Sequence, residues 1–561
     1  MSEFFQDPPE LQNTFTHHRW LRAYLRFKLP KHMVGPIEED LTQLGTRCAF
    51  EYMELARQAE REKPVLVPYE AWGRRVDQIR VSAAWTALKA ISAREGLIAI
   101  GYKRDQAEFS RLYQFAKLYL FHPSSAFFTC PLAMADGAAK VLELSGTLSE
   151  HREAFARLTS RDPERFWTSG QWMTERTGGS DVSRTSTEVR FEGPQARLYG
   201  VKWFSSSTTS EMALALARLP DSVPGSRGLT LFWVPTYLAP GHLNHIRILR
   251  LKDKLGTWAL PTAELQLEGS LAYQIGEKDQ GIKTVANMLN ITRLYNSVCS
   301  IGQTTRALEQ MRDYSNKREA FGARLSDHIL HYSTFAQEEV KLLAGFLLTM
   351  ELVHLLGRDE CGAATGEERD VLRLFTPICK LFTARAAVQT ASEVVEGFGG
   401  AGYIEDTGIP VHLRDSQVFS IWEGATNVLS LDVLRVLQKS EAMESVGRVA
   451  MEKLKSVRSP SLQRWRDDLM ARWTDLASKL TAQTQSGPEL LVASCRDLAF
   501  HLAWLFAATL LVDWAEKETG RNQKVLVAHL AVVMAQLQSW TPRSQQLNSA
   551  LQEIWQGLLE D

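Results

Sequence analysis

Apolar residues recur at intervals of three and four positions through the N-terminal part of the chain. One such series is Ile37, Leu41, Leu44, Cys48, Tyr52 and Leu55. Segments 83–93 and 109–121 resume the same spacing. Because this periodicity places apolar side chains on one face of a helix, the sequence predicts a helical domain, with an N-terminal extension, over residues 1–165.

Between about residues 166 and 280 the pattern changes to short apolar or alternating runs. Residues 212–219 and 229–234 are two of these runs, and Gly225, Gly228 and Pro235 lie between or beside them. Short runs bounded by Gly and Pro are typical of β-strands. We therefore predict a middle β domain over residues 166–280.

After Gly281 the helical spacing returns and continues toward the C-terminus. Residues 281–440 are predicted to form a four-helix-type domain, and residues 441–561 an additional helical domain. A chain of 561 residues is too long for a single core, which agrees with several domains. The predicted fold class is mainly α with a central β domain.

Composition excludes several classes of protein. The formal net charge is −1, so the chain as a whole has no bias toward nucleic acid or an anionic membrane. Its six cysteines form no C-x-x-C pair, which argues against a disulfide framework and against a metal cluster. The longest apolar run, residues 498–512, is shorter than the ~20 residues that a membrane span needs. The first basic residue is Arg19, so a cytoplasmic location is expected.

Two segments rich in small and hydroxyl-bearing residues are candidate ligand-binding motifs. Residues 173–181 read Met-Thr-Glu-Arg-Thr-Gly-Gly-Ser-Asp, and their amide and hydroxyl groups could bind a ring that presents both donors and acceptors. Residues 399–403 read Gly-Gly-Ala-Gly-Tyr. Glycines allow a backbone to approach a phosphate closely. Taken alone, either segment could be an ordinary turn.

Three further motifs carry charged or aromatic side chains. Residues 421–427, Ile-Trp-Glu-Gly-Ala-Thr-Asn, contain the single carboxylate of Glu423, which could act as a base if burial raised its pKa. Arg318 precedes Phe321-Gly322, and an arginine fork suits a pyrophosphate. Residues 202–205 read Lys-Trp-Phe-Ser and follow a predicted strand.

Together these motifs resemble those of the acyl-CoA dehydrogenase family of flavoenzymes. Residues 73–77, 372–377, 420–424 and 431–437 are similar to its AidB-like branch. The resemblance covers about residues 40–440 well, and residues 441–561 only in their helical character. It implies an N-terminal α bundle, a middle β domain, a C-terminal α bundle and an extra C-terminal helical region.

The resemblance also implies that the cofactor is FAD, and it assigns residues to it. Those implied to contact the cofactor are Met173, Thr174, Gly179, Ser180, Trp203, Ser205, Arg318, Phe321, Glu396, Gly399, Gly400 and Asn427. Those implied to contact the substrate are Ser180, Arg293 and Gly424. The chain departs from the common pattern at Glu396 and at Ile329, because many members have Gln at both positions.

The reaction implied is the α,β-dehydrogenation of a fatty acyl-CoA thioester. Glu423 is implied to take the α proton, while the flavin accepts a hydride from the β carbon. Some members carry the base on a helix, directly before an arginine. This chain has Thr292 there, ahead of Arg293, which favours Glu423 as the base.

The resemblance implies partners as well. Arg318 is implied to reach the flavin of a neighbouring subunit, so a homo-oligomer is expected, most simply a dimer of dimers. An electron-transfer flavoprotein is the expected electron acceptor.

Two alternative functions stay open, an AidB-like DNA-associated flavoprotein of the alkylation response and an acyl-CoA oxidase. DNA binding requires clustered cations. Residues 441–561 contain thirteen Lys and Arg against fourteen Asp and Glu, which favours the dehydrogenase and makes nucleic acid an unlikely partner. No residue separates an oxidase from a dehydrogenase.

Overall fold

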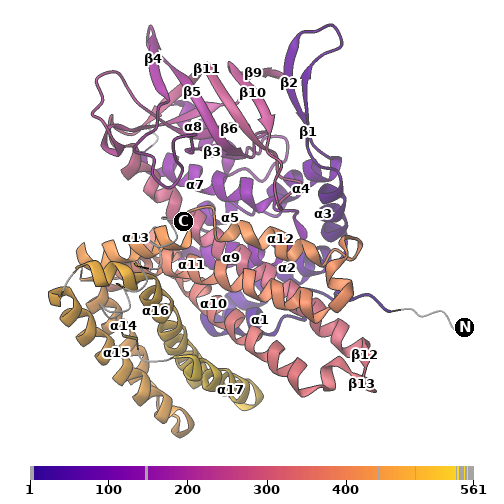
Figure 1. Cartoon of the computed structure of the whole chain (residues 1–561), viewed down its shortest axis with the longest axis vertical. Coiled ribbons are helices and arrows are strands. Elements are labelled where there is room, and N and C mark those ends of the chain that lie inside the picture. The colour runs from indigo at the N-terminus through magenta and orange to yellow at the C-terminus, as the bar shows by residue number, and fades with distance from the viewer. Residues whose placement is uncertain are drawn as a thin grey trace, which may run out of the picture.

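A β domain lies at one end of the molecule, above a large helical body (Figure 1). The computed structural model describes residues 6–145, 149–439, 441–486 and 488–537, together with positions 540, 541, 549 and 553. The predicted class, mainly α with a central β domain, is confirmed. Apart from positions 549 and 553, the end of the predicted domain 441–561 beyond residue 541 lies outside the described residues.

The N-terminal part is built mostly from helices. They are α1 Arg19–Lys28, α2 Lys31–Ala49, α3 Glu51–Arg61, α4 Ala83–Arg94, α5 Ala99–Lys103, α6 Ser110–Phe121, α7 Thr129–Ser145 and α8 Ser149–Leu158. The apolar series that begins at Ile37 marks the buried face of α2. On α1 the buried side chains are Trp20, Leu21, Tyr24 and Leu25, again on one face.

A β-hairpin interrupts these helices, although the sequence analysis predicted only helix there. Strands β1 Val65–Tyr69 and β2 Arg75–Arg80 pair antiparallel. Pro64 and Pro68 disfavour helix, whereas Val65 and Val67 favour extended backbone. Gly73 supplies the positive φ of +85° that the turn requires.

The middle domain is a seven-stranded sheet with the order β3-β6-β7-β11-β5-β4, and β10 pairs with β11 outside this path. Its strands are β3 Ser169–Trp172, β4 Glu188–Glu192, β5 Gln195–Ser206, β6 Met212–Ala217, β7 Thr230–Pro235, β10 Ile246–Leu251 and β11 Thr262–Ile275; a small separate sheet joins β8 Tyr237–Ala239 and β9 His242–Leu243. The long β11 pairs with β5 over most of its length and with β7 at its end. It thereby joins the two halves of the sheet.

Long helices form the body under the sheet. They are α9 Gly281–Lys317, α10 Ile329–Glu360 and α11 Gly366–Gly397, followed by the shorter α12 Pro410–Phe419 and α13 Thr426–Lys439. A small hairpin, β12 Glu319–Ala320 and β13 Ala323–Arg324, joins α9 to α10. Helix α9 packs against α7, α10 and α11, so it is buried along most of its length.

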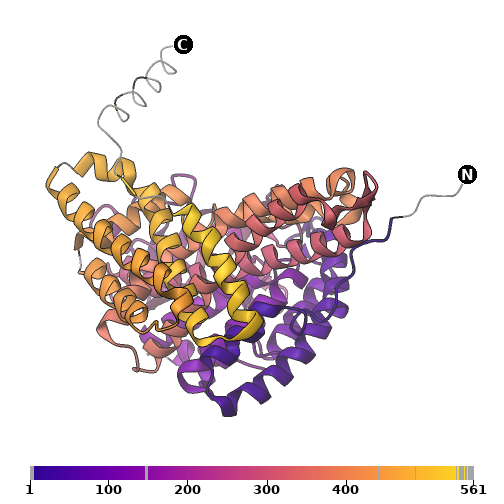
Figure 2. The same cartoon turned by 90° about the horizontal axis from the view of Figure 1, so that it is seen from below.

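Four more helices, α14 Ala442–Lys455, α15 Pro460–Ser486, α16 Pro488–Lys517 and α17 Gly520–Gln536, pack along one side of this body (Figure 2). Helix α17 meets α1, where Arg19 donates a hydrogen bond to Asn522 at 2.7 Å. Helices α10 and α16 are long and apolar enough to cross a membrane, but 89% and 83% of their apolar windows are buried within the protein. Both are therefore core helices of this fold.

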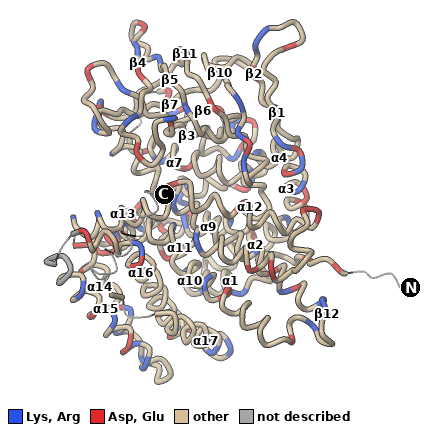
Figure 3. Tube along the Cα trace, in the orientation of Figure 1, with Lys and Arg blue, Asp and Glu red and all other residues tan. Residues whose placement is uncertain are grey.

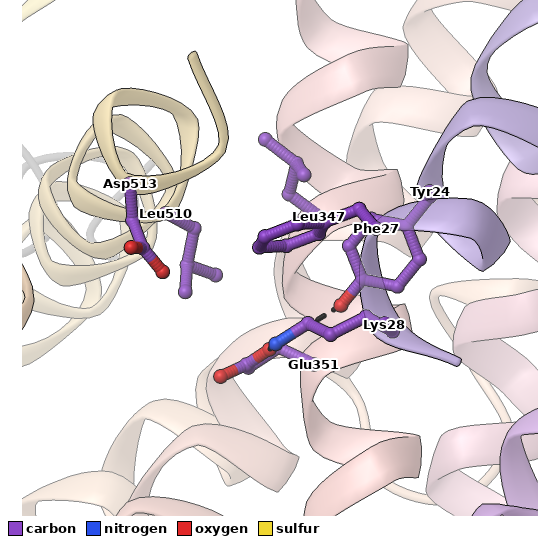
Figure 4. Close-up of a pocket in the computed structure, with 7 residues that line it drawn as sticks. All are labelled: Tyr24, Phe27, Lys28, Leu347, Glu351, Leu510 and Asp513. Atoms are coloured by element: carbon purple, nitrogen blue, oxygen red, sulfur yellow. Dashed lines mark hydrogen bonds and ion pairs between the residues drawn. The ribbon is translucent and has the colours of Figure 1, made fainter. Parts of the chain in front are cut away.

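A buried ion cluster ties the two ends of the chain to the helical body (Figure 4). Glu351 on α10 pairs with Lys28 on α1 at 2.5 Å and with Lys453 on α14 at 3.1 Å. Lys453 also pairs with Asp513 on α16 at 3.4 Å. Burial alone would raise the pKa of Glu351, but Lys28 and Lys453 hold this pKa well below its usual range. One carboxylate thus connects α1, α10 and α14, and through Lys453 also α16.

Replacing Glu351 by Gln should lower the free energy of unfolding by about 3 kcal/mol, because the buried ammonium group of Lys28 would lose its carboxylate and Lys453 would keep only Asp513. Denaturant unfolding followed by tryptophan fluorescence measures this loss. The contribution of a carboxylate with a depressed native pKa is present above its unfolded pKa and is lost as pH falls through the native value. The difference in the free energy of unfolding between the wild type and Glu351→Gln should therefore disappear at acidic pH.

The matched control is Glu367→Gln, whose partner Arg448 leaves the ion pair largely exposed. That change should alter stability by no more than about 1 kcal/mol. Equal stability of the Glu351 variant and the wild type would contradict the anchoring role.

Candidate active site

Glu423 lies in the turn between α12 and α13, in a conformation that is rare for its residue type. Its φ is +56°, and the φ of Gly424 is +107°. A non-glycine residue in the left-handed region is strained and is held there by its surroundings. Gly424 is required, because a Cβ there would lie 2.8 Å from the Leu429 side chain. The turn therefore aims one carboxylate in a fixed direction.

Two long helices hold this turn from different sides. Thr292 on α9 donates its hydroxyl to Glu423 Oε2 at 2.6 Å. Lys380 on α11 donates from Nζ to the carbonyl oxygen of Gly424 at 2.6 Å, and its side chain is fully buried. The first contact fixes the carboxylate, and the second fixes the backbone next to it.

The environment of Glu423 shifts its pKa upward. Burial is the largest influence, and it outweighs the hydrogen bond from Thr292 and the positive charges of Arg293 and Lys380. Part of the residue reaches solvent, but protein surrounds the carboxyl group densely. Burial also lowers the pKa of Lys380 to about 7. A carboxylate with a raised pKa is a stronger base than one in water.

The predicted substrate residue Arg293 lies beside this turn. Its Nη1 pairs with Asp432 of α13 at 2.9 Å, and Asp432 also bonds Arg435. The pair spans from α9 to α13 and keeps the Arg293 side chain close to the Glu423 turn. Arg293 is therefore positioned to act on the charge of Glu423, whose pKa it lowers.

The first glycine-rich motif is braced by a buried ion pair that the sequence analysis did not identify. Glu175 pairs with Lys202 at 2.8 Å, and it accepts hydrogen bonds from Ser186 and Thr187. Although burial opposes it, Lys202 lowers the pKa of Glu175 to about 2, so this carboxylate stays ionised and braces the loop. The only signal in the sequence was that the first motif contains acidic residues, Glu175 among them, and that the Lys-Trp-Phe-Ser motif begins with a lysine.

The other predicted residues of this region lie around the same loop. The carbonyl oxygen of Thr174 accepts from the Trp203 amide at 2.9 Å, and a Cβ on Gly179 would lie 3.0 Å from the Thr174 side chain. Met173 is buried, whereas Ser180 is exposed. Lys252 Nζ lies 3.5 Å from the ring centroid of Trp203. These contacts fix Trp203 on β5 beside the motif.

Three buried polar atoms in this region have no hydrogen-bond partner among the residues that the structure describes. They are Gln171 Oε1 and Trp172 Nε1 on β3, and Ser205 Oγ on β5. Buried polar atoms are normally paired, so these groups are available to a water molecule or to a ligand. Hydroxyl, amide and indole groups suit a ligand that offers both donors and acceptors.

The second group of predicted residues gathers where α9 and α11 end. Arg318 follows the last residue of α9, and Phe321, with φ +52° and 99% exposure, forms the tip of the β12–β13 hairpin. Glu396 lies exposed in the last turn of α11. At Gly399, whose φ is +61°, and at Gly400, no heavy atom lies within 4 Å of the position that a Cβ would occupy, which leaves open space beside the backbone.

Phe398 stacks on Tyr314 with ring centroids 4.5 Å apart, which joins these two helix ends. In Figure 1 the β12–β13 hairpin lies at the opposite end of the helical body from the β domain. Asn427 belongs to neither group, because its Oδ1 accepts from Arg496 Nη1 of α16 at 2.8 Å. The predicted cofactor residues thus form two separate groups within one chain.

Comparisons with protein families match three consecutive regions. Residues 6–163 match the adaptive response protein AidB N-terminal domain, residues 170–270 the acyl-CoA dehydrogenase middle domain, and residues 279–438 the acyl-CoA dehydrogenase C-terminal domain. The boundaries between the matched regions coincide with the changes from helices to strands and from strands back to helices.

Individual proteins are similar over most of the chain. Acyl-CoA dehydrogenase family member 11 of Caenorhabditis elegans is 42% identical over 536 residues, 93% of this chain and 87% of the relative. The putative acyl-CoA dehydrogenase AidB of Escherichia coli is 31% identical over 71% of this chain and 73% of the relative. The crystal structure of Caenorhabditis elegans ACDH-11 in complex with C11-CoA superposes with a TM-score of 0.94 at 39% identity, covering 99% of this chain and 97% of that one.

Proposed function

The chain belongs to the acyl-CoA dehydrogenase family, and we propose that it removes the α and β hydrogens of a fatty acyl-CoA thioester with Glu423 as the base. The observation that carries this proposal is the Glu423 turn. A single carboxylate is held in a strained conformation, has a raised pKa and contacts Thr292 at 2.6 Å. The α proton of a thioester is weakly acidic, so its removal needs such a base.

FAD is the cofactor of this family, and when bound it supplies the acceptor for the hydride that leaves the β carbon. The residues of this chain fit it. Ser205 offers an unpaired buried hydroxyl two residues after Trp203, and Gly399 and Gly400 leave open space beside their backbone. We propose that Ser205 contacts the ring system and that the glycines lie against the pyrophosphate.

The acid–base step depends on the groups around Glu423. Before the reaction, Arg293 and Lys380 favour its ionised form. Burial disfavours that charge, so the carboxylate gains stability when it takes the α proton onto an oxygen. Thr292 fixes the direction of Oε2, and the Lys380 contact prevents the turn from relaxing.

We propose further that the working enzyme is a homo-oligomer, most simply a dimer of dimers, that passes its electrons to an electron-transfer flavoprotein. The two groups of cofactor residues lie apart in one chain, so one dinucleotide would need both groups from different subunits. Phe321, Leu330 and Tyr403 are 99%, 83% and 89% exposed near the second group. Large exposed apolar side chains of this kind are typical of subunit contacts.

The charge distribution supports this function over the DNA-associated alternative. Over the described part of residues 441–537, Lys and Arg are interleaved with Asp and Glu (Figure 3). Arg466 and Arg472 pair with Asp467 and Asp468, and Lys479 pairs with Asp475. Lysine and arginine side chains that are already paired with carboxylates contribute less to binding a phosphate backbone.

Glu423→Gln should keep the fold and the bound flavin but abolish dehydrogenation, because an amide cannot accept the α proton. Anaerobic mixing with an acyl-CoA should bleach the flavin absorbance of the wild type only. Far-UV circular dichroism and the flavin spectrum check that the variant is folded and loaded. Bleaching at the wild-type rate in this variant would place the base elsewhere.

Lys380→Met should move the acidic limit of activity to higher pH. Lys380 lowers the pKa of Glu423, so removal of its charge raises that pKa and leaves Glu423 protonated and inactive over a wider acidic range. The rate of flavin bleaching from about pH 5 to about pH 9 measures the shift. The same variant should also be slower at its optimum, because Gly424 loses its clamp.

The control for this variant is Lys341→Met, which removes a lysine of α10 that pairs with Glu338. Its pH profile should match that of the wild type. An unchanged acidic limit in the Lys380 variant would show that this lysine does not act on Glu423.

Arg318→Ala should weaken FAD retention by about tenfold to a hundredfold, the loss expected for one charge-assisted hydrogen-bonding group. Release of flavin fluorescence during dilution measures the dissociation constant. Arg324→Ala, on the same hairpin, removes an exposed cation and should leave retention unchanged. Equal retention by both variants would refute the role of Arg318.

A further inference from the structure

We propose that a groove between α10, α11 and α16 binds a diphosphate attached to a planar base, the group found in ADP. This α11–α16 groove has a volume of about 600 Å³. Its lining residues are Lys341 from α10, Phe382, Arg385, Ala386, Gln389 and Glu393 from α11, and Arg496, Phe500 and Trp504 from α16. Small-molecule sites have volumes in this range. The proposal does not depend on the reaction proposed above.

The groove lies on a different face of α11 from the catalytic turn. Its other α11 residues follow Phe382 by three, four, seven and eleven positions, so they form one stripe along the helix. Lys380, which holds the Glu423 turn, precedes Phe382 by two residues and therefore points roughly 200° away around the helix. The groove is thus separated from Glu423 by the body of α11.

Part of the groove comes from outside the regions that match the family's domains. The match to the acyl-CoA dehydrogenase C-terminal domain ends at residue 438, whereas Arg496, Phe500 and Trp504 belong to α16. These three residues repeat every four positions and so line one face of that helix. The additional helices therefore create this groove by covering α11.

The groove lining carries three cations, Lys341, Arg385 and Arg496, against one carboxylate, Glu393. Lys341 pairs with Glu338 at 2.7 Å, but Arg496 contacts only the neutral amide of Asn427 among the described ion pairs and hydrogen bonds. Arg385 forms no ion pair or hydrogen bond with any residue that the structure describes, although it is partly buried. Partly buried guanidinium groups without a carboxylate are costly unless an anion joins them. Their fork geometry matches phosphate oxygens.

Aromatic side chains occupy the other wall of the groove. Trp504 meets Phe382 edge to face, with ring centroids 5.0 Å apart at 87°, which fixes the orientation of the indole. Phe500 lies one turn earlier on α16, and both α16 rings are partly exposed. Stacking of a base on such a ring contributes about 1–3 kcal/mol. Two arginines beside fixed aromatic rings match a ligand that joins phosphate to a planar base.

The test is calorimetric titration of the FAD-saturated full chain with ADP, inorganic pyrophosphate and adenosine. ADP should bind more tightly than inorganic pyrophosphate or adenosine alone. Arg385→Ala and Arg496→Ala should each weaken ADP and pyrophosphate by about tenfold or more, whereas Trp504→Leu should weaken ADP and adenosine only. Arg385→Lys keeps the positive charge but lacks the forked guanidinium group. Its ADP affinity should therefore lie between those of the wild type and Arg385→Ala. The matched control, Arg373→Ala, removes an exposed arginine of α11 outside the groove and should change nothing.

The same titrations identify the source of the ADP group. Binding without release of flavin indicates a free nucleotide, and competition by coenzyme A that spares flavin indicates the substrate carrier. Both of these outcomes require the arginine dependence. Expulsion of FAD by ADP would instead show binding at the flavin site, where Gly399 and Gly400 are assigned to the pyrophosphate, and would overturn the proposal.

The proposal would be overturned if ADP did not bind, or if ADP bound Arg385→Ala and Arg496→Ala as tightly as the wild type. So would groove variants that change the sedimenting mass and leave ADP affinity intact, because the groove would then be a subunit contact. Thermal unfolding of every variant identifies any that fail to fold. Since these measurements need no turnover, their failure is distinct from failure of Glu423 as the base.

Discussion

The structure depends on holding the carboxyl group of Glu423 in a densely packed turn that strains its backbone. Glu423 is held in a left-handed turn, and its pKa rises through burial even though Arg293 and Lys380 oppose the rise. A turn of this kind would relax by itself. Its persistence requires α9 and α11, which supply Thr292 and Lys380 from two directions. Two long buried helices therefore position this turn as well as forming the core.

The same solution, a buried charge held by residues from distant elements, recurs through the molecule. Glu175 and Lys202 brace the glycine-rich loop, and Glu351 joins three helices through Lys28 and Lys453. Buried ion pairs add little net stability compared with well-packed apolar residues, but breaking one is costly. We infer that these pairs specify which surfaces meet. The arginines of the α11–α16 groove differ because the described chain gives them no carboxylate.

The sequence predicted the features that are local in the chain. The fold class followed from spacing and turn residues, and Glu423 was identified from a motif of seven consecutive residues. The hairpin β1–β2 was missed because it lies within a region of helical periodicity. Lys380 and Arg496 were missed for a different reason, since their partners Gly424 and Asn427 are 44 and 69 residues away. No spacing rule connects such residues before the fold brings them together.

The Glu351 cluster also constrains the order in which the protein can be completed. Lys28 and Glu351 are 323 residues apart, so at about 5–20 residues per second roughly 15–65 s separate their synthesis. During that time the buried face of α1, with Trp20, Leu21 and Tyr24, has no α10 to cover it. The start of the chain therefore reaches its final packing only after α10, in the second half of the protein, has been synthesised.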